Sequence, residues 1–373
     1  MWPHVQVNQV DQRQGESKEI ERVLLFVGKG KNAMGETRPI NTQTDLDALL
    51  GAEANPLKSN IKAAMANAGQ NWFAYVHVLP ENAADTAFVD AVLTAQSVAS
   101  VEGYVYIGET SKATIKAAQT LRATLLAKFG RWTWGMLSVV GLQEAETWQK
   151  ALTRLSVLQK GETEASIQLV PVLWGNEAGV LAGRLCHQSV TIADSPARVQ
   201  TGALIDLGRS DFPKDSEGVN IDLATLQALE KMRFSVPMWY PDYDGLYWSE
   251  GRTLSVEGGD FQAIENLRIV DKVARRVRLQ AIAKIGDRSL NSTPNSIESH
   301  KSYFSRTMRE MARSTEINGV TFPGECQPPQ EGDVAIVWKT KNTVDIYITV
   351  RTYACPKGIT VSILLDAKLE ANQ

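Results

Sequence analysis

The sequence lacks the features of an exported or membrane-inserted chain. It has three cysteines, Cys186, Cys326 and Cys355, which lie far apart and are odd in number, so the pattern favours a reducing compartment over a disulfide framework. Residues 1–10 contain neither a basic start nor an apolar run, and we expect no export signal. No stretch approaches about 18 uninterrupted apolar residues, so we expect no membrane-spanning helix.

Histidine is also scarce, and the histidines do not form a metal-binding pattern. None lies in an HExxH pair, and His77, inside an apolar strand-like run, is typical of a hydrogen-bonded core residue. We therefore predict no metal site and no cofactor. The four histidines are His4, His77, His187 and His300.

Two stretches imitate catalytic sites. Residues 30–37 (GKNAMGET) follow an apolar strand as a phosphate-binding loop does, but Glu36 stands where that loop needs a lysine, which favours a plain glycine-rich loop. The carboxylates of Asp242, Asp244 and Glu250 lie among aromatic residues, as in sugar-cleaving sites. Prolines and a glycine nearby favour a surface loop instead, so we predict no catalytic residue.

Charge of neither sign is in large excess. The formal net charge is −3, which gives no bulk argument for nucleic acid or an anionic membrane as partner. With 43% hydrophobic and 22% charged residues the composition is that of an ordinary globular protein. A length of 373 residues favours two or three domains.

Strand-like and helix-like segments alternate between residues 22 and 173. The strand-like runs are short and almost entirely apolar, which is typical of strands buried on both faces of a parallel sheet. Their alternation with helical windows predicts βαβ units and a doubly wound α/β domain. The predicted strands are 23–27, 72–79, 103–107, 136–140 and 167–173, and the predicted helices are 45–50, 61–68, 86–99, 112–129 and 144–158.

The carboxyl-terminal region contains two alternating strands and a third strand with no obvious partner. The first two are joined by the short polar loop 339–342, which predicts a hairpin. An isolated hairpin is marginal, so the third strand either folds back as a meander or joins the sheet of a neighbouring subunit, with Pro356 and Gly358 as the hinge. The apolar faces of the second and third strands consist of Val344, Ile346, Ile348 and Val350, then Val361, Ile363 and Leu365.

The amino-terminal residues repeat this arrangement. Val5 and Val7 alternate with polar residues, and residues 11–21 are polar except for Ile20. Such a segment is either a frayed terminus or a second exchanged arm. Strands tethered at both ends of a chain are the pattern expected of a protein that weaves itself into a polymer.

A long amphipathic helix is predicted at residues 264–285. One face is apolar, and the rest is rich in basic residues that would fit an acidic partner, although a solvated face is the alternative. DNA fits less well, because this basic cluster stands alone in an acidic chain. The candidate contact residues are Lys272, Arg275, Arg276 and Arg278.

From Leu173 onward the order of segments resembles the contractile-tail sheath proteins. Residues 174–184 (WGNEAGVLAGR) resemble the sheath helix in which Ala-Gly-Val precedes a small-residue turn. A Pro-Ala segment, a helix at 223–232 and a strand at 234–239 follow, and residues 248–254 (WSEGRTL) stand where the family has an aromatic loop ending in Gly-x-Arg-Thr-Leu. Two long helices, 264–285 and 296–314, and the hairpin come next. Two departures indicate a divergent member: residues 185–188 (LCHQ) replace an Asp-Arg-Gly segment, and Ser249 stands where a tryptophan is usual.

The resemblance implies a structural subunit and not an enzyme. Sheath subunits form hexameric rings stacked around an inner tail tube, and contraction drives the tube through the host envelope. The implied fold is a doubly wound outer domain at 22–260 and an inner, tube-facing α+β domain at 261–353, with arms at 1–21 and 354–373 whose strands complete a small antiparallel sheet in neighbouring copies. Strand exchange would involve Val5, Val7, Val344, Ile346, Ile348, Val350, Val361, Ile363 and Leu365, and tube contact would involve Lys272, Arg275, Arg276 and Arg278.

The implied partners are further copies of the chain, the tail tube protein, the baseplate and the tail terminator, with no membrane insertion and no direct nucleic-acid contact. The expected location is the virion tail, after assembly in the bacterial host cytoplasm. Two alternatives remain at this point. One is the sheath of a tailocin or bacterial contractile injection system, and the other is an α/β enzyme that binds a nucleotide or metabolite.

Overall fold

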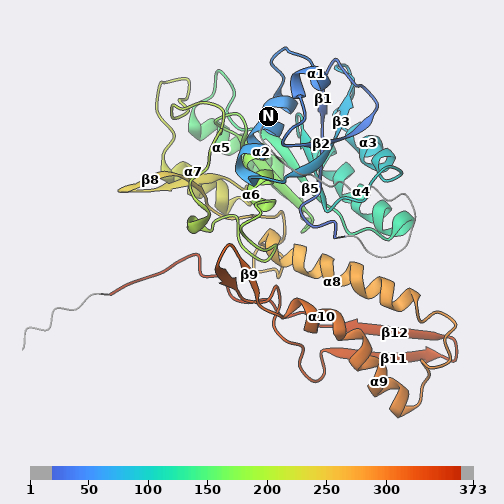
Figure 1. Ribbon diagram of the computed structural model, residues 1–373. Coiled ribbons are helices and arrows are strands. Elements are labelled where there is room, and N and C mark those ends of the chain that lie inside the picture. Colours follow the sequence, from blue (N-terminus) through green and yellow to red (C-terminus); the bar gives the residue numbers. More distant parts are fainter. Residues whose placement is uncertain (1–18, 363–373) are drawn as a thin grey trace, which may run out of the picture.

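A six-stranded sheet organises the first part of the chain in the computed structural model, which describes residues 19–362 (Figure 1). The strand order is β2-β3-β1-β4-β5-β6, and all neighbours are parallel except β2, which runs antiparallel to β3. The predicted mostly parallel α/β sheet is confirmed. The strands are β1 (Leu24–Lys29), β2 (Thr37–Asn41), β3 (Phe73–Leu79), β4 (Gly103–Ile107), β5 (Trp134–Val140) and β6 (Ile167–Val172).

Strand β2 was not predicted from the sequence. It carries Arg38 and Pro39, and Ile40 is its one fully buried residue. A proline and polar side chains are tolerated on an edge strand, since one side of its backbone needs no partner. It follows the glycine-rich loop 30–36, so no helix begins where a phosphate-binding loop requires one.

Helices cover both faces of the sheet. The connection from β1 to β3 crosses the sheet in the opposite direction from those that follow, so right-handed crossovers put α2 on one face and α3 and α4 on the other. Helix α4 shows how the sequence sets helix ends: Ser111 and Thr114 form a capping box, and Gly130 ends the helix with φ +60°. These helices are α1 (Leu46–Leu50), α2 (Pro56–Ala68), α3 (Phe88–Ala95), α4 (Lys112–Phe129), α5 (Trp148–Gln159), α6 (Glu177–Leu185) and α7 (Leu223–Lys231).

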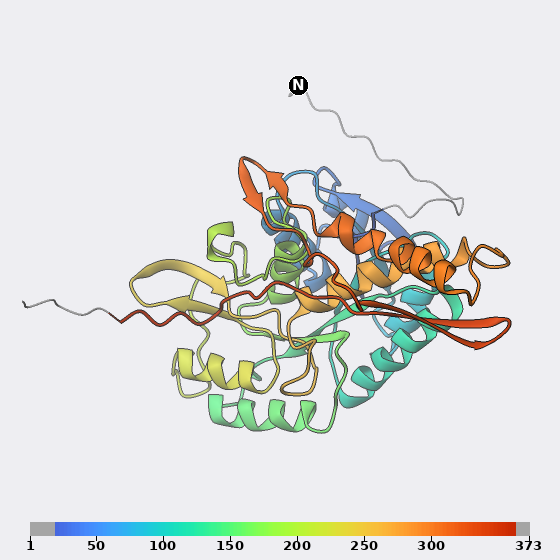
Figure 2. The ribbon, with the colours of Figure 1, turned by 90° about the horizontal axis from the view of Figure 1, so that it is seen from below.

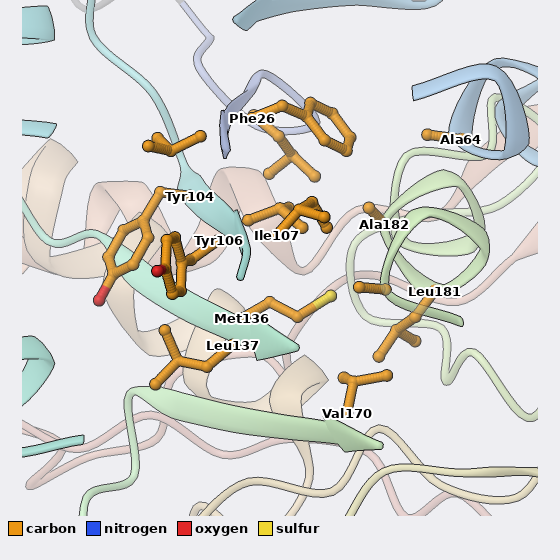
Figure 3. Close-up of a cluster of buried hydrophobic side chains, with 14 of the residues drawn as sticks. Phe26, Ala64, Tyr104, Tyr106, Ile107, Met136, Leu137, Val170, Leu181 and Ala182 are labelled. Atoms are coloured by element: carbon orange, nitrogen blue, oxygen red, sulfur yellow. The ribbon is translucent and has the colours of Figure 1, made fainter. Parts of the chain in front are cut away.

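The first hydrophobic core lies between this sheet and its helices. Figure 3 shows Phe26 of β1, Met136 of β5 and Val170 of β6 facing Leu181 of α6, and all four side chains are buried. Because the strands are apolar on both faces, the sheet is stable only with helices on each side.

The segment around Asp242 is a β-hairpin and not the predicted surface loop. Strands β7 (Pro237–Tyr240) and β8 (Tyr243–Trp248) pair antiparallel, and a two-residue turn joins them in which Asp242 has φ +60°. Three tyrosines of this hairpin pack against one another, the exposed Tyr240 and Tyr243 and the buried Tyr247, and such cross-strand aromatic contacts stabilise a hairpin. A short 3-10 helix, Val199–Thr201, precedes this hairpin.

The carboxyl-terminal elements form a second layer with its own core (Figure 1). The predicted helix at 296–314 is two helices that meet at Ser305. The hairpin predicted from Asp333 is confirmed as an antiparallel pair, but residues 349–362 form no strand. The elements are α8 (Ile264–Ile282), α9 (Pro294–Phe304), α10 (Arg306–Met311), β9 (Thr315–Ile317), β10 (Val320–Phe322), β11 (Val334–Thr340) and β12 (Thr343–Ile348).

Within residues 19–362, no helix combines the length and apolar character needed to cross a bilayer. The same residues contain no group of three or more His, Cys, Asp or Glu side chains placed to hold a metal ion.

Candidate inter-subunit surfaces

Helix α8 joins the two cores. Ile264 and Leu267 belong to the first core, and Ile269 and Val273 belong to the second. An amphipathic helix with apolar residues on two sides must be covered on both, which fixes the carboxyl-terminal layer against the α/β layer. Figure 1 accordingly shows α8 between the large sheet and the β11–β12 hairpin.

Buried ion pairs reinforce this junction. Arg268 of α8 donates to both carboxylate oxygens of Glu102, and Arg122 of α4 donates to both oxygens of Asp271 at 3.0 and 2.8 Å. Burial by itself raises the pKa of Glu102, but the Arg268 guanidinium more than reverses this, so that its pKa lies below its ordinary value. The Glu102 carboxylate is therefore ionised and fully paired.

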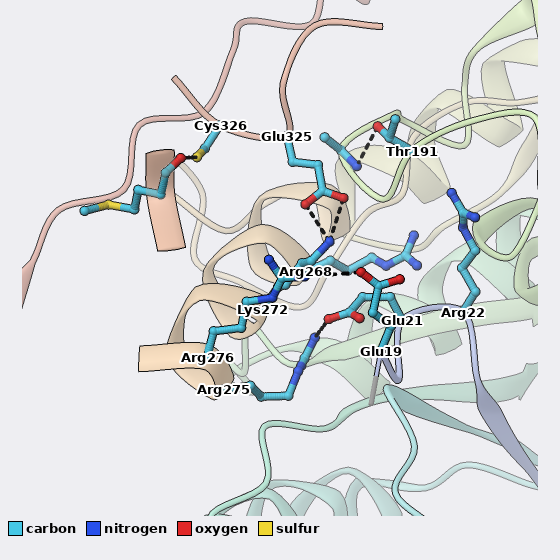
Figure 4. Close-up of polar contacts among 12 residues, drawn as sticks. Glu19, Glu21, Arg22, Thr191, Arg268, Lys272, Arg275, Arg276, Glu325 and Cys326 are labelled. Carbon is cyan, nitrogen blue, oxygen red and sulfur yellow. Dashed lines mark hydrogen bonds and ion pairs between the residues drawn. The ribbon is translucent and has the colours of Figure 1, made fainter. Parts of the chain in front are cut away.

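The structure separates the four candidate tube-facing residues. Lys272 is buried and its Nζ donates to Glu325 at 2.7 and 2.8 Å. Arg275 donates to Glu21, in the segment before β1, at 2.7 Å, as Figure 4 shows, and to the backbone carbonyl of Trp132. Lys272 and Arg275 thus have partners within their own chain.

The other two basic residues are more accessible. Arg276 lies 3.3 Å from Glu19, whose side chain is 76% exposed, and Arg278 is exposed beside Gly130 at the end of α4. A single exposed ion pair contributes little, so the Arg276 guanidinium is available to a competing carboxylate.

The β11–β12 hairpin forms a two-stranded sheet. Ile336 pairs with Ile346 and Trp338 with Val344, and their side chains lie on the face that packs against the second core. No third strand pairs with either edge among the residues that the structure describes. Each outer edge therefore presents backbone N–H and C=O groups to which another strand can add. The apolar face that the sequence predicted also includes Ile348, at the end of β12, and Val350, just beyond it, and both are half-buried on the same core.

The segment after β12 is held at two places. Gln327 donates to the backbone carbonyls of Arg351 and Thr352, at 2.8 and 3.0 Å, and Arg351 pairs with Asp333. Further along, Lys357 pairs with Glu250 and with Glu265 at 2.8 Å.

Residues 358–362, which follow Lys357, extend away from the body of the subunit. Ile359 is 78% exposed and Val361 75% exposed, so these two apolar side chains are not covered by the body of their own subunit. Figures 1 and 2 both show this segment leaving on the side opposite the hairpin tip. It therefore does not pair with its own hairpin. Val5, Val7, Ile363 and Leu365 lie outside the described residues.

Helix α6, whose sequence resembles the sheath helix, packs very closely against helix α2. A Cβ added to Gly179 would lie 2.0 Å from the Asn60 carbonyl oxygen, and one added to Gly183 would lie 2.5 Å from the Ala64 carbonyl oxygen. The spacing of four residues puts both glycines on one face of α6, where the backbone of α2 packs directly. Glu177, at the start of α6, is fully buried and accepts hydrogen bonds from the backbone N–H groups of residues 173–175.

Comparison with known proteins identifies the family. Residues 2–252 match the family model "DUF2586, N-terminal domain", and residues 260–368 match "DUF2586, C-terminal domain". A protein of Haemophilus phage HP1 (strain HP1c1), which carries the name of a tail sheath protein, is 52% identical over 373 residues, covering 98% of both chains. The chain belongs to this family of contractile tail sheath proteins. The resemblance seen in the sequence is thereby confirmed, and a sheath is a structural component of a phage tail or injection system.

Solved structures share the fold of this sheath protein. A chain of the six-fold symmetrised anti-feeding prophage baseplate has a TM-score of 0.58 at 12% identity, covering 98% of this chain and 99% of its own. A sheath tail protein from Listeria innocua has a TM-score of 0.55 at 10% identity, covering 90% and 93%. Another from Desulfitobacterium hafniense has 0.52 at 9%, covering 94% and 96%.

The sequence did not indicate the contacts that hold the arm and α8 in place. Glu102, Glu265 and Lys357 were absent from the candidates, since their partners lie 92 to 166 residues away along the chain. One signal was present: the first half of α8 carries the charged residues Glu265, Arg268, Asp271 and Lys272 among its apolar residues, and all four are buried.

Proposed function

We propose that the chain is the repeating subunit of a contractile phage tail sheath, in which hexameric rings stack around an inner tail tube. Contraction of the sheath drives the tube through the host envelope. The observation that supports this most directly is the combination of a two-stranded hairpin with open edges and an exposed apolar arm that points away from it. The tail sheath relative gives the proposal its biological setting.

Strand addition is the physical basis of the polymer. A donated strand makes several backbone hydrogen bonds worth about 1 kcal/mol each and covers the apolar side chains that are exposed in the single subunit. Val344, Ile346, Ile348 and Val350 define the receiving strand, and Val361, Ile363 and Leu365 define the donated one. Val5 and Val7 define a second donated strand.

The placement of donor and acceptor favours a ring or a helix over a closed pair. The arm that would donate a strand and the hairpin that would receive one lie on opposite sides of one subunit. Each contact is therefore head-to-tail, and a row of subunits keeps a free arm at one end and a free hairpin at the other. The anti-feeding prophage baseplate, to which one fold relative belongs, is six-fold symmetrised, and this supports rings of six.

Contraction requires the same rigid bodies to adopt two packings. The buried ion pairs of α8 keep the two layers of each subunit together, so motion between subunits is left to the segments that connect each subunit to its exchanged strands. The extended form would persist because its release is slow and not because it is the most stable state.

The proposed assembly includes the tail tube protein, the baseplate and the tail terminator as partners, without membrane insertion or direct nucleic-acid contact. Subunits assemble in the bacterial host cytoplasm before incorporation into the virion tail. Of the candidate tube-facing residues, Arg276 and Arg278 are the accessible pair, whereas Lys272 and Arg275 are paired with Glu325 and Glu21 within the subunit.

Truncation tests the exchange of arms. Full-length protein is compared by negative-stain microscopy, at increasing concentration, with variants that lack residues 1–18 or 358–373, which retain Glu19, Glu21 and Lys357. We expect tubes or rings from the full-length protein and folded, non-polymerising subunits from either variant. Normal assembly of both truncated proteins would show that the arms are not exchanged.

A tailocin or bacterial injection system is the second candidate, and the anti-feeding prophage relative favours it. The genes beside this one discriminate: capsid and terminase genes next to the tube gene indicate a phage, and their absence indicates an injection device.

A further inference from the structure

The last contact between the carboxyl-terminal arm and its own subunit, within residues 19–362, is with two carboxylates, of which Glu265 is buried and Glu250 is partly buried. Glu265 stands in the first turn of α8 and is 3% exposed, and Glu250 follows strand β8. Lys357 Nζ lies between them, 2.8 Å from Glu265 Oε1 and within hydrogen-bond distance of Glu250 Oε1. One ammonium group from the arm therefore binds two carboxylates from the body.

Contacts within the body of the subunit, without the arm, hold these two carboxylates close together. Ile264 donates a backbone hydrogen bond to the Gly251 carbonyl at 2.8 Å, which brings the residues next to both carboxylates together. A side chain on Gly251 would collide with Ile264, so the approach requires glycine. Ser235 Oγ holds the Glu250 backbone carbonyl at 2.7 Å. These contacts fix the two carboxylates on rigid elements.

Two like charges held this closely need a cation. Burial, and then the charge of Glu265, raise the pKa of Glu250 even with Lys357 present. Burial by itself lowers the pKa of Lys357, and the two carboxylates more than reverse it. Glu265 Oε2 is buried and has no hydrogen-bond partner among the described residues, so the site depends on the ammonium for its charge balance.

The chain changes character directly after this contact. Gly358 has no atom within 4 Å of the position of an added Cβ, and Ile359 is exposed. No hydrogen bond or ion pair joins residues 358–362 to another described residue. Among the residues of the arm that the structure describes, Lys357 is therefore the last one attached to its own subunit.

We propose that Glu250 and Glu265 form a lysine-binding site that moors the arm to its own subunit through Lys357, so that the exchanged segment begins at Gly358. This inference rests on the proposed exchange of strands between copies. The mooring fixes the point and direction from which the donated strand departs. Without it the free segment would begin after Thr352, five residues earlier, which lengthens the tether by about 17 Å and lowers the effective concentration of the strand at the neighbouring hairpin.

The test uses full-length protein with Lys357→Met, which keeps the length of the side chain and removes its charge. Lys357→Arg keeps the charge, and Lys31→Met removes a lysine from an exposed pair in the α/β layer. Two quantities are measured: the critical concentration for polymerisation by sedimentation, and backbone hydrogen exchange at residues 353–362 in unassembled protein.

We expect Lys357→Met to speed exchange at residues 353–358 about tenfold and to raise the critical concentration about tenfold, as loss of about 1.4 kcal/mol predicts. Lys357→Arg and Lys31→Met should stay within about twofold of the unaltered protein. Unchanged exchange or an unchanged critical concentration in Lys357→Met overturns the mooring.

A triple variant covers the case in which Lys357→Met fails to fold because two carboxylates are left without a cation. Glu250→Gln, Glu265→Gln and Lys357→Met together remove all three charges, and this protein should fold but assemble as poorly as expected for a loose arm. Assembly at the normal concentration overturns the mooring. The deletion of residues 358–373 separates the two proposals. If the deleted protein still assembles, strand exchange itself is wrong. If the deleted protein does not assemble but Lys357→Met assembles normally, only the mooring is wrong.

Discussion

Arg268 Nε and Nη2 donate to the two carboxylate oxygens of Glu102 at 2.5 and 2.9 Å, and both side chains are buried although they lie 166 residues apart in the sequence. Arg268 belongs to α8, and Glu102 lies immediately before β4 at the start of a central strand. The pair therefore joins the carboxyl-terminal layer to the sheet. In the contraction that we propose, such a junction would let each subunit move as a unit.

Removing one partner of this pair should strongly destabilise the subunit. Arg268→Met leaves the Glu102 carboxylate buried without its cation, and we expect the free energy of unfolding to fall by about 3–5 kcal/mol. Urea denaturation followed by fluorescence measures the change. Arg306→Met, which breaks an exposed pair with Glu310 on α10, is the control and should change stability little.

The double variant Arg268→Met with Glu102→Gln should recover part of the loss, because no unpaired charge remains. If Arg268→Met alone proved as stable as the unaltered protein, the pair would not hold the two layers together.

Glu177 should make stability depend on pH near neutrality. Burial raises the pKa of its carboxyl from 4.5 to about 7, against the backbone N–H groups that favour the ionised form. A raised pKa means that the folded state binds the proton more tightly, so this contribution is fully present below about pH 4.5 and is lost as pH rises through about 7. We expect about 3 kcal/mol to be gained on acidification across this window, at about 1.4 kcal/mol per pKa unit.

The measurement is the free energy of unfolding at several pH values for the unaltered protein and for Glu177→Gln. The glutamine variant cannot titrate and should show a flatter profile between pH 4.5 and 7. If the unaltered protein instead lost more stability than Glu177→Gln on acidification from pH 7 to 4.5, the backbone N–H donors would outweigh burial and the pKa of Glu177 would not be raised.

The accessible basic residues of α8 should govern association with the tube. Reversing Arg276 and Arg278 to glutamate should weaken binding to the cognate tube protein about tenfold, since charges at the rim of an interface mainly affect association with a charged partner. Sheath-only polymers should persist, because neither residue belongs to the second core or contacts residues 354–362, and the pair that Arg276 forms with Glu19 is exposed and weak. Co-sedimentation with purified tubes and negative-stain microscopy of sheath alone give the two readouts.

Arg306→Glu on α10, also exposed, is the matched charge reversal and should leave both readouts unchanged. Loss of tube binding and of sheath polymers together would show that this face of α8 packs between subunits.

The local part of the fold could be predicted from the sequence. Apolar runs at 23–27 and 103–107 gave strands β1 and β4, and the pattern at 112–129 gave α4 with its observed ends, because periodicity and capping are encoded within one segment. The alternation after Asp333 gave the hairpin. The break of the second helix at Ser305 and the edge strand β2 were missed, because packing against distant residues decides both.

The candidate site could be predicted only in outline. The spacing of basic and apolar residues in the sequence predicted an amphipathic basic helix at α8. The same spacing does not show that Lys272 binds Glu325 or that Arg275 binds Glu21. Those partners come from other parts of the chain and are close only after folding.

The amino-acid sequence by itself determined the α/β alternation, the hairpin, the glycine-containing helix of the sheath family and the two apolar segments at the ends. Each of these features is set by residues that are close to one another in the sequence. The tertiary structure alone decided which charges are buried, which are free, and where the arm departs from its subunit. Coulomb attraction and desolvation depend on distance in space, and Lys357 becomes a neighbour of Glu265 only when the chain between them has folded.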